Sequence, residues 1–174
     1  MQTFNIKIGG EAGQGLVSIG NILLQATAQE GWYLFAHQDY ESRIRGGHNF
    51  FQLRLADQPV ASWESEIDVL VALDETTITL GQKELRADGV LIYDPDVLGK
   101  ETREYVKRPN CLGLPFARMA QELGQHKIMA NAVAAGAVWA LLSDDLAVLN
   151  DTLEAMFASK GDAVVAGNQK VAEA

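Results

Sequence analysis

The chain opens with alternating apolar and polar residues and then changes to a helical spacing. Phe4, Ile6 and Ile8 fall on one side of an extended segment, which predicts a strand. Residues 16–31 carry apolar side chains at helical spacing and end in a glycine, so they predict a helix. The short apolar run at residues 32–36 predicts a second, buried strand that runs parallel to the first.

The middle of the chain contains four further extended patterns. Residues 49–55 alternate and residues 60–63 follow after a turn, so we predict an antiparallel hairpin. Residues 68–73 and 89–93 are short apolar runs that favour buried parallel strands, and Asp74 can cap a helix over residues 75–86 between them. Together these patterns predict a mixed sheet.

Helical spacing dominates the last third of the chain. Residues 116–123, 130–142 and 146–158 each predict a helix, and residues 162–174 continue the pattern without a glycine or proline stop. The predicted fold is α/β, a Rossmann-like mixed, mostly parallel sheet with helices on both faces and a helical C-terminal part. We expect residues 1–174 to form a single domain, and the unterminated last helix indicates one domain of a larger polypeptide or complex.

Composition excludes several kinds of partner and site. The formal net charge of −9 repels phosphate backbones and acidic membrane surfaces, so we expect no nucleic-acid and no membrane partner. The single cysteine, Cys111, can form no internal disulfide and cannot alone hold an iron–sulfur cluster or a structural zinc. The three histidines are scattered and indicate no metal site. We expect a cytoplasmic protein with no catalytic residue set of its own.

Four glycines in the seven residues 9–15 connect the first strand to the first helix. They let the backbone take positive φ and approach a partner closely, while the first N–H groups of the helix point back at the loop. Such a loop suits an anion, or it forms no more than a tight strand-to-helix turn. Ala12 occupies the middle glycine position of G-x-G-x-x-G, so the segment departs from the dinucleotide-binding pattern.

A second candidate site is the basic segment that contains Arg43 and Arg45 and ends in the glycine pair 46–47. Two guanidinium groups beside a glycine pair suit a clamp for a carboxylate or a phosphate. The alternative is a solvated loop whose arginines form ordinary ion pairs with Asp39 or Glu41.

Three segments, in this order, resemble motifs of the gamma subunits and gamma domains of 2-oxoacid:ferredoxin (acceptor) oxidoreductases. Residues 9–15 are similar to that family's opening G-x-G-G-Q-G loop, with Ala12 where a glycine is frequent. Residues 42–48 resemble its S-x-x-R-G-G motif, and residues 68–74 resemble its D-v-l-v-a-l-d strand. Asn131 begins a segment similar to its N-x-x-x-x-G helix start, where the side chain either caps the helix or faces a ligand.

The resemblance implies a complex that oxidatively decarboxylates a 2-oxoacid such as 2-oxoglutarate or pyruvate, forms an acyl-CoA and passes electrons to ferredoxin. It implies alpha and beta subunits or domains as partners, with ferredoxin as an indirect one. Thiamine diphosphate, Mg²⁺ and iron–sulfur clusters would belong to other parts of the complex, so this chain alone would bind no cofactor. The sequence of residues 45–49 most resembles that of family members whose gamma domain is fused ahead of an alpha domain.

CoA, the substrate or a phosphate group would contact this chain at its two loops and at the helix that Asn131 opens. The expected ligand-binding residues are Gly10, Gly13, Gln14, Gly15, Arg43, Arg45, Gly46, Gly47 and Asn131. Two other interpretations stay open from the residues alone: a free-standing Rossmann-like nucleotide-binding protein and a purely structural docking module. In a complex, we also expect the chain to present apolar surface to neighbouring domains.

Overall fold

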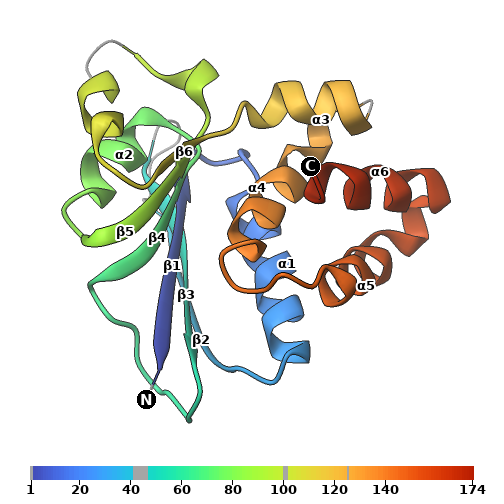
Figure 1. Cartoon of the computed structure of the whole chain (residues 1–174), viewed down its shortest axis with the longest axis horizontal. Coiled ribbons are helices and arrows are strands. Elements are labelled where there is room, and N and C mark those ends of the chain that lie inside the picture. Colours follow the sequence, from blue (N-terminus) through green and yellow to red (C-terminus); the bar gives the residue numbers. More distant parts are fainter. Residues whose placement is uncertain (1, 41–46, 100–101, 125) are drawn as a thin grey trace.

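The computed structural model describes residues 2–40, 47–99, 102–124 and 126–174, and this part of the chain forms one sheet with helices on both faces (Figure 1). The six strands of this sheet follow the order β2-β3-β1-β4-β5-β6. They are β1 (Thr3–Gly10), β2 (Tyr33–Asp39), β3 (Asn49–Ala56), β4 (Ile67–Ala72), β5 (Leu85–Tyr93) and β6 (Cys111–Gly113). Because β1, β4, β5 and β6 pair in parallel and β3 pairs antiparallel with both β1 and β2, the sheet is mixed and mostly parallel, as predicted.

Helices α1 and α4 pack on one face of the sheet and α2 on the other, while α3, α5 and α6 pack against α1 and α4 as a helical C-terminal part (Figure 1). The helices are α1 (Leu16–Gln29), α2 (Glu75–Gly81), α3 (Phe116–Gly124), α4 (Ala130–Trp139), α5 (Ala147–Phe157) and α6 (Asp162–Ala172). Short 3-10 turns are η1 (Pro95–Val97), η2 (Thr102–Lys107), η3 (Lys127–Met129) and η4 (Ala158–Lys160). Across the described ranges, no helix combines the length and the apolar character that crossing a membrane requires.

Alternate residues of the central strand β4 enter two separate apolar clusters. Val69 and Val71 belong to the cluster beneath α1 and α4, whereas Leu70 packs with Ile78 of α2 on the opposite face. Both faces of β4 are therefore covered, which explains why residues 68–73 form an uninterrupted apolar run.

Polar side chains of β3 point to the same face as α2 and hold the segment that follows this strand. Arg54 forms an ion pair with Glu64, and the Gln52 Nε2 group donates a hydrogen bond of 2.6 Å to the Glu64 carbonyl. Residues 60–63 form no strand, so the predicted hairpin is wrong. The reason is that β1 and β2 already occupy both edges of β3, which leaves no free edge for a returning strand.

Strand β2 lies at the edge of the sheet, not in its interior. It runs in the same direction as β1, but β3 lies between the two strands and pairs antiparallel with both. The prediction of a buried neighbour of β1 is therefore wrong, and Tyr33 on β2 is 49% exposed.

The cap of α2 was predicted correctly, but the end of this helix was not. The Asp74 carboxylate accepts a hydrogen bond of 2.7 Å from the Thr77 N–H and caps α2, as predicted. Helix α2 ends at Gly81 instead of extending to residue 86, because the chain from Leu85 onward pairs with β4 as strand β5. The last helix ends at Ala172.

Candidate functional site

The carboxyl ends of β1, β4 and β5 meet at one edge of the sheet, because these strands are parallel neighbours. A pocket of about 160 Å³ lies at this edge, between the segments that follow the three strands and the amino ends of α3 and α4. We call it the strand-end pocket; its lining residues are Gln14, Leu73, Asp94, Phe116, Ala117, Ala130 and Asn131. Open sheets of this class bind ligands outside the carboxyl ends of their strands.

The side chain of Gln14 folds back onto the backbone of the glycine loop between β1 and α1. The Gln14 Oε1 atom accepts a hydrogen bond of 2.7 Å from the Glu11 N–H, and the Gln14 N–H donates one of 3.2 Å to the Glu11 carbonyl. A Cβ on Gly10 would lie 2.5 Å from Gln14 Oε1, so the folded-back glutamine requires glycine there. Gly13 and Gly15 have φ values of 91° and 85°, which confirms the expected positive φ.

Asn131 lies against the glycine loop although the two segments are far apart in sequence. A Cβ on Gly15 would lie 2.4 Å from both terminal atoms of the Asn131 amide, so Gly15 lets the α1 start and the α4 start approach closely. The alternative role of Asn131 as a helix cap is wrong: α4 begins at Ala130, and Met129 holds the cap position without a side-chain hydrogen bond. The turn η3 runs directly into α4, so Asn131 already belongs to the first helical turn.

Asp94, directly after β5, is a residue of the strand-end pocket that our sequence analysis did not name as a site residue. Its side chain is buried and accepts a hydrogen bond of 2.8 Å from the Asp96 N–H. Burial raises the pKa of the Asp94 carboxyl, and the backbone N–H groups of Asp96, Ala117 and Phe116 offset part of this effect. The signal was available in the sequence, because Asp94 directly follows the apolar run at residues 89–93 just as Asp74 follows the run at residues 68–73.

The basic segment is described only in part: Arg43, Arg45 and Gly46 lie outside the described residues. Gly47 is described and buried, and it precedes β3, where Asn49 pairs with Gly10 at the end of β1. The described chain therefore resumes near the end of β1, from which the glycine loop continues.

The strand-end pocket offers hydrogen bonds instead of a reactive group. Gln14 and Asn131 carry neutral amides that can both donate and accept, whereas the Asp94 carboxylate is already engaged by backbone N–H groups. Within the ranges that the structure describes, no group of three or more His, Cys, Asp or Glu side chains could hold a metal ion. The arrangement can recognise a ligand through amide hydrogen bonds.

Comparison with known proteins places these features in a family. The model of the family described as pyruvate ferredoxin/flavodoxin oxidoreductase matches residues 5–174. The 2-oxoglutarate synthase subunit KorC of Methanothermobacter marburgensis is 31% identical over 138 residues, which are 76% of this chain and 74% of KorC. The chain also matches the alpha subunit of a 2-oxoacid:ferredoxin oxidoreductase from a Sulfolobus species over 90 residues at 37% identity, and this match spans only 14% of that subunit.

Solved structures share the fold over nearly the whole chain. The 2-oxoglutarate:ferredoxin oxidoreductase from Magnetococcus marinus matches 99% of this chain and 30% of its own with a TM-score of 0.87 and 22% identity. The pyruvate oxidoreductase subunit PORC from Thermotoga maritima matches 99% of this chain and 94% of its own with a TM-score of 0.76 and 25% identity. The resemblance to gamma subunits that the order of the motifs indicated is confirmed.

Proposed function

The chain belongs to the pyruvate ferredoxin/flavodoxin oxidoreductase family, and on this basis we propose that it is the gamma-type part of a 2-oxoacid:ferredoxin oxidoreductase complex. In this complex a 2-oxoacid is oxidatively decarboxylated to an acyl-CoA and the electrons pass to ferredoxin. Alpha and beta subunits or domains are its partners, and they hold the thiamine diphosphate, Mg²⁺ and iron–sulfur clusters. The chain acts as one domain of this larger assembly, and we propose that the assembly is cytoplasmic.

The strand-end pocket, the glycine loop and the basic segment with Arg43 and Arg45 form the contact of this chain with CoA. The observation that carries this proposal is the convergence of Gln14 and Asn131, which are distant in sequence, at the amino end of α4. The Magnetococcus marinus enzyme, which shares the fold, has coenzyme A and succinyl-CoA bound, and this supports the proposal. CoA would supply the thiol that accepts the acyl group.

The residues of the pocket suit one part of CoA better than another. Because the backbone N–H groups at the start of α3 already face the Asp94 carboxylate, the pocket has little capacity left for a phosphate. The amides of Gln14 and Asn131 suit the neutral amide groups of the pantetheine arm. The phosphates of CoA would then contact Arg43 and Arg45, whose guanidinium groups bind phosphate bidentately.

The test is the steady-state kinetics of the complete complex with CoA as the varied substrate. A neutral hydrogen bond contributes about 0.5–1.5 kcal/mol, so Gln14→Ala and Asn131→Ala should each raise the apparent KM for CoA by about two- to tenfold. A charged hydrogen bond contributes about 1.5–3 kcal/mol, so Arg45→Ala should raise KM more than tenfold, and Arg45→Lys should recover only part of the loss.

Gln82→Ala is the matched control, because Gln82 follows the end of α2 and does not line the strand-end pocket. An unchanged KM in all the pocket variants, combined with a lowered melting temperature, would show that these residues only stabilise the fold. An unchanged KM with impaired assembly would favour the structural docking module.

A further inference from the structure

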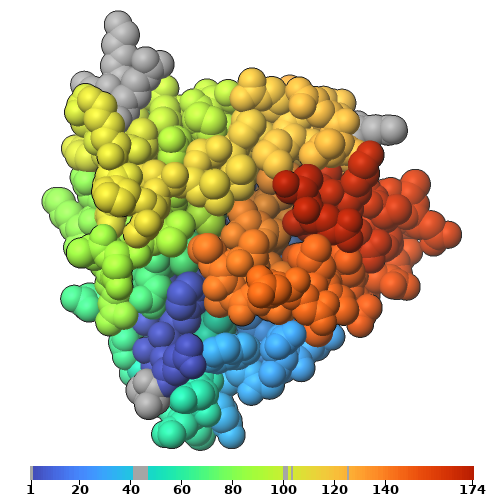
Figure 2. Space-filling model, viewed as in Figure 1, coloured from blue at the N-terminus to red at the C-terminus, as the bar shows by residue number. Residues whose placement is uncertain are grey.

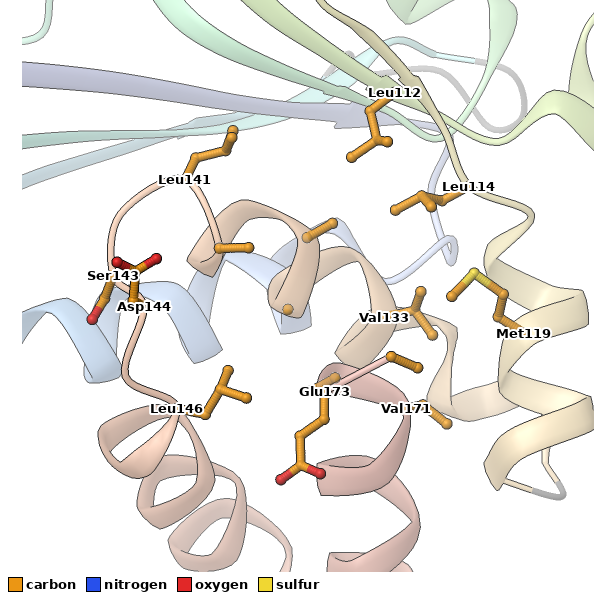
Figure 3. Close-up of a pocket in the computed structure, with 15 residues that line it drawn as sticks. Leu112, Leu114, Met119, Val133, Leu141, Ser143, Asp144, Leu146, Val171 and Glu173 are labelled. Carbon is orange, nitrogen blue, oxygen red and sulfur yellow. The ribbon is translucent and has the colours of Figure 1, made fainter.

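An apolar groove lies on the helical side of the sheet, away from the strand-end pocket. It has a volume of about 450 Å³ and lies between β6, the second half of α4, the α4–α5 loop and the end of α6. We call it the α4–α6 groove; its large apolar lining residues are Leu112, Leu114, Met119, Val133, Leu141, Leu146 and Val171. Figure 3 shows Leu112, Leu114 and Met119 toward one end and Ser143 and Asp144 toward the other.

The floor of the groove is open because α4 carries only small residues there. Gly136, Ala137 and Ala140 line it. Gly136 cannot be larger, since a Cβ would lie 2.1 Å from the Ala172 carbonyl oxygen of α6, and this contact fixes the distance between the two helices. The groove therefore follows from the close packing of α4 on α6.

The loop that forms one wall is held by hydrogen bonds of its own. The Trp139 Nε1 group donates to the Asp145 carbonyl at 2.8 Å, and the Ala147 N–H donates to Asp145 Oδ1 at 2.9 Å. Trp139 itself is fully buried in the core. The wall is thus preorganised, so the binding of a partner would lose little conformational entropy in ordering it.

Apolar surface continues from the groove onto the outside of the molecule. Leu112 is 39% exposed and Leu141 is 41% exposed, on opposite sides of the groove. In Figure 2 the surface of the segment with β6 and α3 adjoins that of the C-terminal helices in this region. A small molecule enclosed in the groove would leave both leucines in water, whereas a polypeptide lying across it would cover them.

The charges around the groove are all negative. Asp144 and Glu173 line it, and none of its described lining residues is a lysine, arginine or histidine. A second copy of this chain, with a net charge of −9, would be repelled by this rim. A segment that carries a lysine or arginine beside its apolar side chains would instead be complementary.

We propose that the α4–α6 groove receives a segment of another subunit or domain of the complex, with aliphatic or aromatic side chains in the groove and a lysine or arginine beside Asp144 and Glu173. This inference rests on the proposed place of the chain in an oxidoreductase complex. It does not involve the CoA contact, so the two proposals can fail separately.

The first test fills the groove in the complete complex. Ala140→Trp places a large side chain in the groove, and Ala155→Trp, at an exposed position of α5 that does not line it, is the matched control. We expect Ala140→Trp to weaken association at least tenfold, measured by dilution and size-exclusion chromatography, and Ala155→Trp to leave association unchanged. Equal association of the two variants would overturn the proposal.

The second test identifies the occupant. The photo-crosslinking amino acid p-benzoylphenylalanine in place of Leu141 should capture, in the assembled complex, a peptide of another subunit or domain that contains apolar residues and a lysine or arginine. Glu173→Lys should reduce this cross-link severalfold, whereas Asp151→Lys, on the exposed side of α5, should not. A cross-link to a second copy of the chain, to a peptide without a basic residue, or to no polypeptide at all would overturn the proposal.

The apparent KM for CoA of the assembled fraction, measured on the same preparations, keeps the two proposals apart. Weakened association of Ala140→Trp, with a normal KM in every variant, supports the groove proposal alone. Weakened association of Ala140→Trp, with a KM that rises only in the pocket variants, supports both proposals.

Discussion

The two ends of helix α4 belong to surfaces of opposite character. At its amino end, Asn131 contributes an amide to a polar pocket together with Gln14 and Asp94. From Gly136 to its carboxyl end, the same helix forms the floor of an apolar groove with an acidic rim. The helix itself is almost uniform, a run of alanine, valine and glycine, so the difference comes from the neighbouring elements.

This contrast shows how one fold separates ligand contacts from subunit contacts. Polar groups gather where parallel strands end, because each strand there gives way to a loop whose backbone and side chains still need hydrogen-bond partners. Apolar surface remains where two helices approach closely over glycine and neither supplies a side chain to fill the space. If the two surfaces have separate functions, each can be damaged without the other.

The largest expected effect comes from Gly136→Ala. The added Cβ would lie 2.1 Å from a backbone oxygen of Ala172, so α6 must move, and such overpacking costs about 1–3 kcal/mol of unfolding free energy. We expect a value near the upper end, because the contacted atom is backbone. The assembled fraction should keep its KM for CoA, since Asn131 lies at the other end of the helix.

Gly167→Ala is the control for this change. Its Cβ would approach the flexible end of the Met129 side chain at 2.7 Å and the Gly124 carbonyl oxygen at an ordinary contact distance of 3.5 Å. Alanine is favoured over glycine in a helix by about 1 kcal/mol. Urea unfolding should therefore show a loss for Gly136→Ala and little change or a gain for Gly167→Ala. A KM that rises together with the loss of stability in Gly136→Ala would contradict the independence of the two surfaces.

An intermediate effect is expected in the glycine loop, where two variants can be compared. Gly13→Ala and Gly15→Ala both place alanine at positive φ, which costs about 1–2 kcal/mol. A Cβ on Gly13 meets nothing within 4 Å, whereas one on Gly15 displaces the Asn131 amide. The two variants should lose similar stability, but Gly15→Ala should raise the KM for CoA further. Equal KM values for the two variants would show that Asn131 does not contribute to CoA binding.

The sequence was most informative where structure depends on near neighbours. The apolar run of β4, the cap at Asp74 and the positive φ of Gly13 and Gly15 follow from local backbone chemistry, and all were confirmed. Strand partners were harder, because the turn that predicts a returning strand at residues 60–63 does not report that both edges of β3 are taken.

The same limit applies to the candidate site. The glycine loop was predicted from its sequence, but the contact between Gly15 and Asn131 depends on how α1 and α4 pack on the sheet. The position of Asp94 in the pocket likewise depends on where α3 begins relative to β5. The roles of Arg43 and Arg45 stay predictions.

The smallest expected effect is a change in the pH dependence of stability in Asp94→Asn. Because burial raises the pKa of the Asp94 carboxyl above its ordinary value of about 4, the folded protein favours the protonated form. This contribution to stability is fully present below the pKa of the unfolded chain and is lost as the pH rises through the folded pKa. Asparagine cannot ionise, so the variant should gain stability relative to the parent as the pH rises from 4 to 7.

Asparagine also cannot accept every backbone N–H that faces the carboxylate, which should cost about 1–3 kcal/mol at every pH. This constant offset is separated from the slope by measuring urea unfolding of both proteins at several pH values. Asp151→Asn, at an exposed position of α5 that does not contribute to the pKa shift of Asp94, is the control and should show neither the slope nor the offset. A relative loss of stability with rising pH would mean that the backbone N–H groups outweigh burial. The carboxylate would then be the favoured form, and Asp94 would hold the amino end of α3 as an anion.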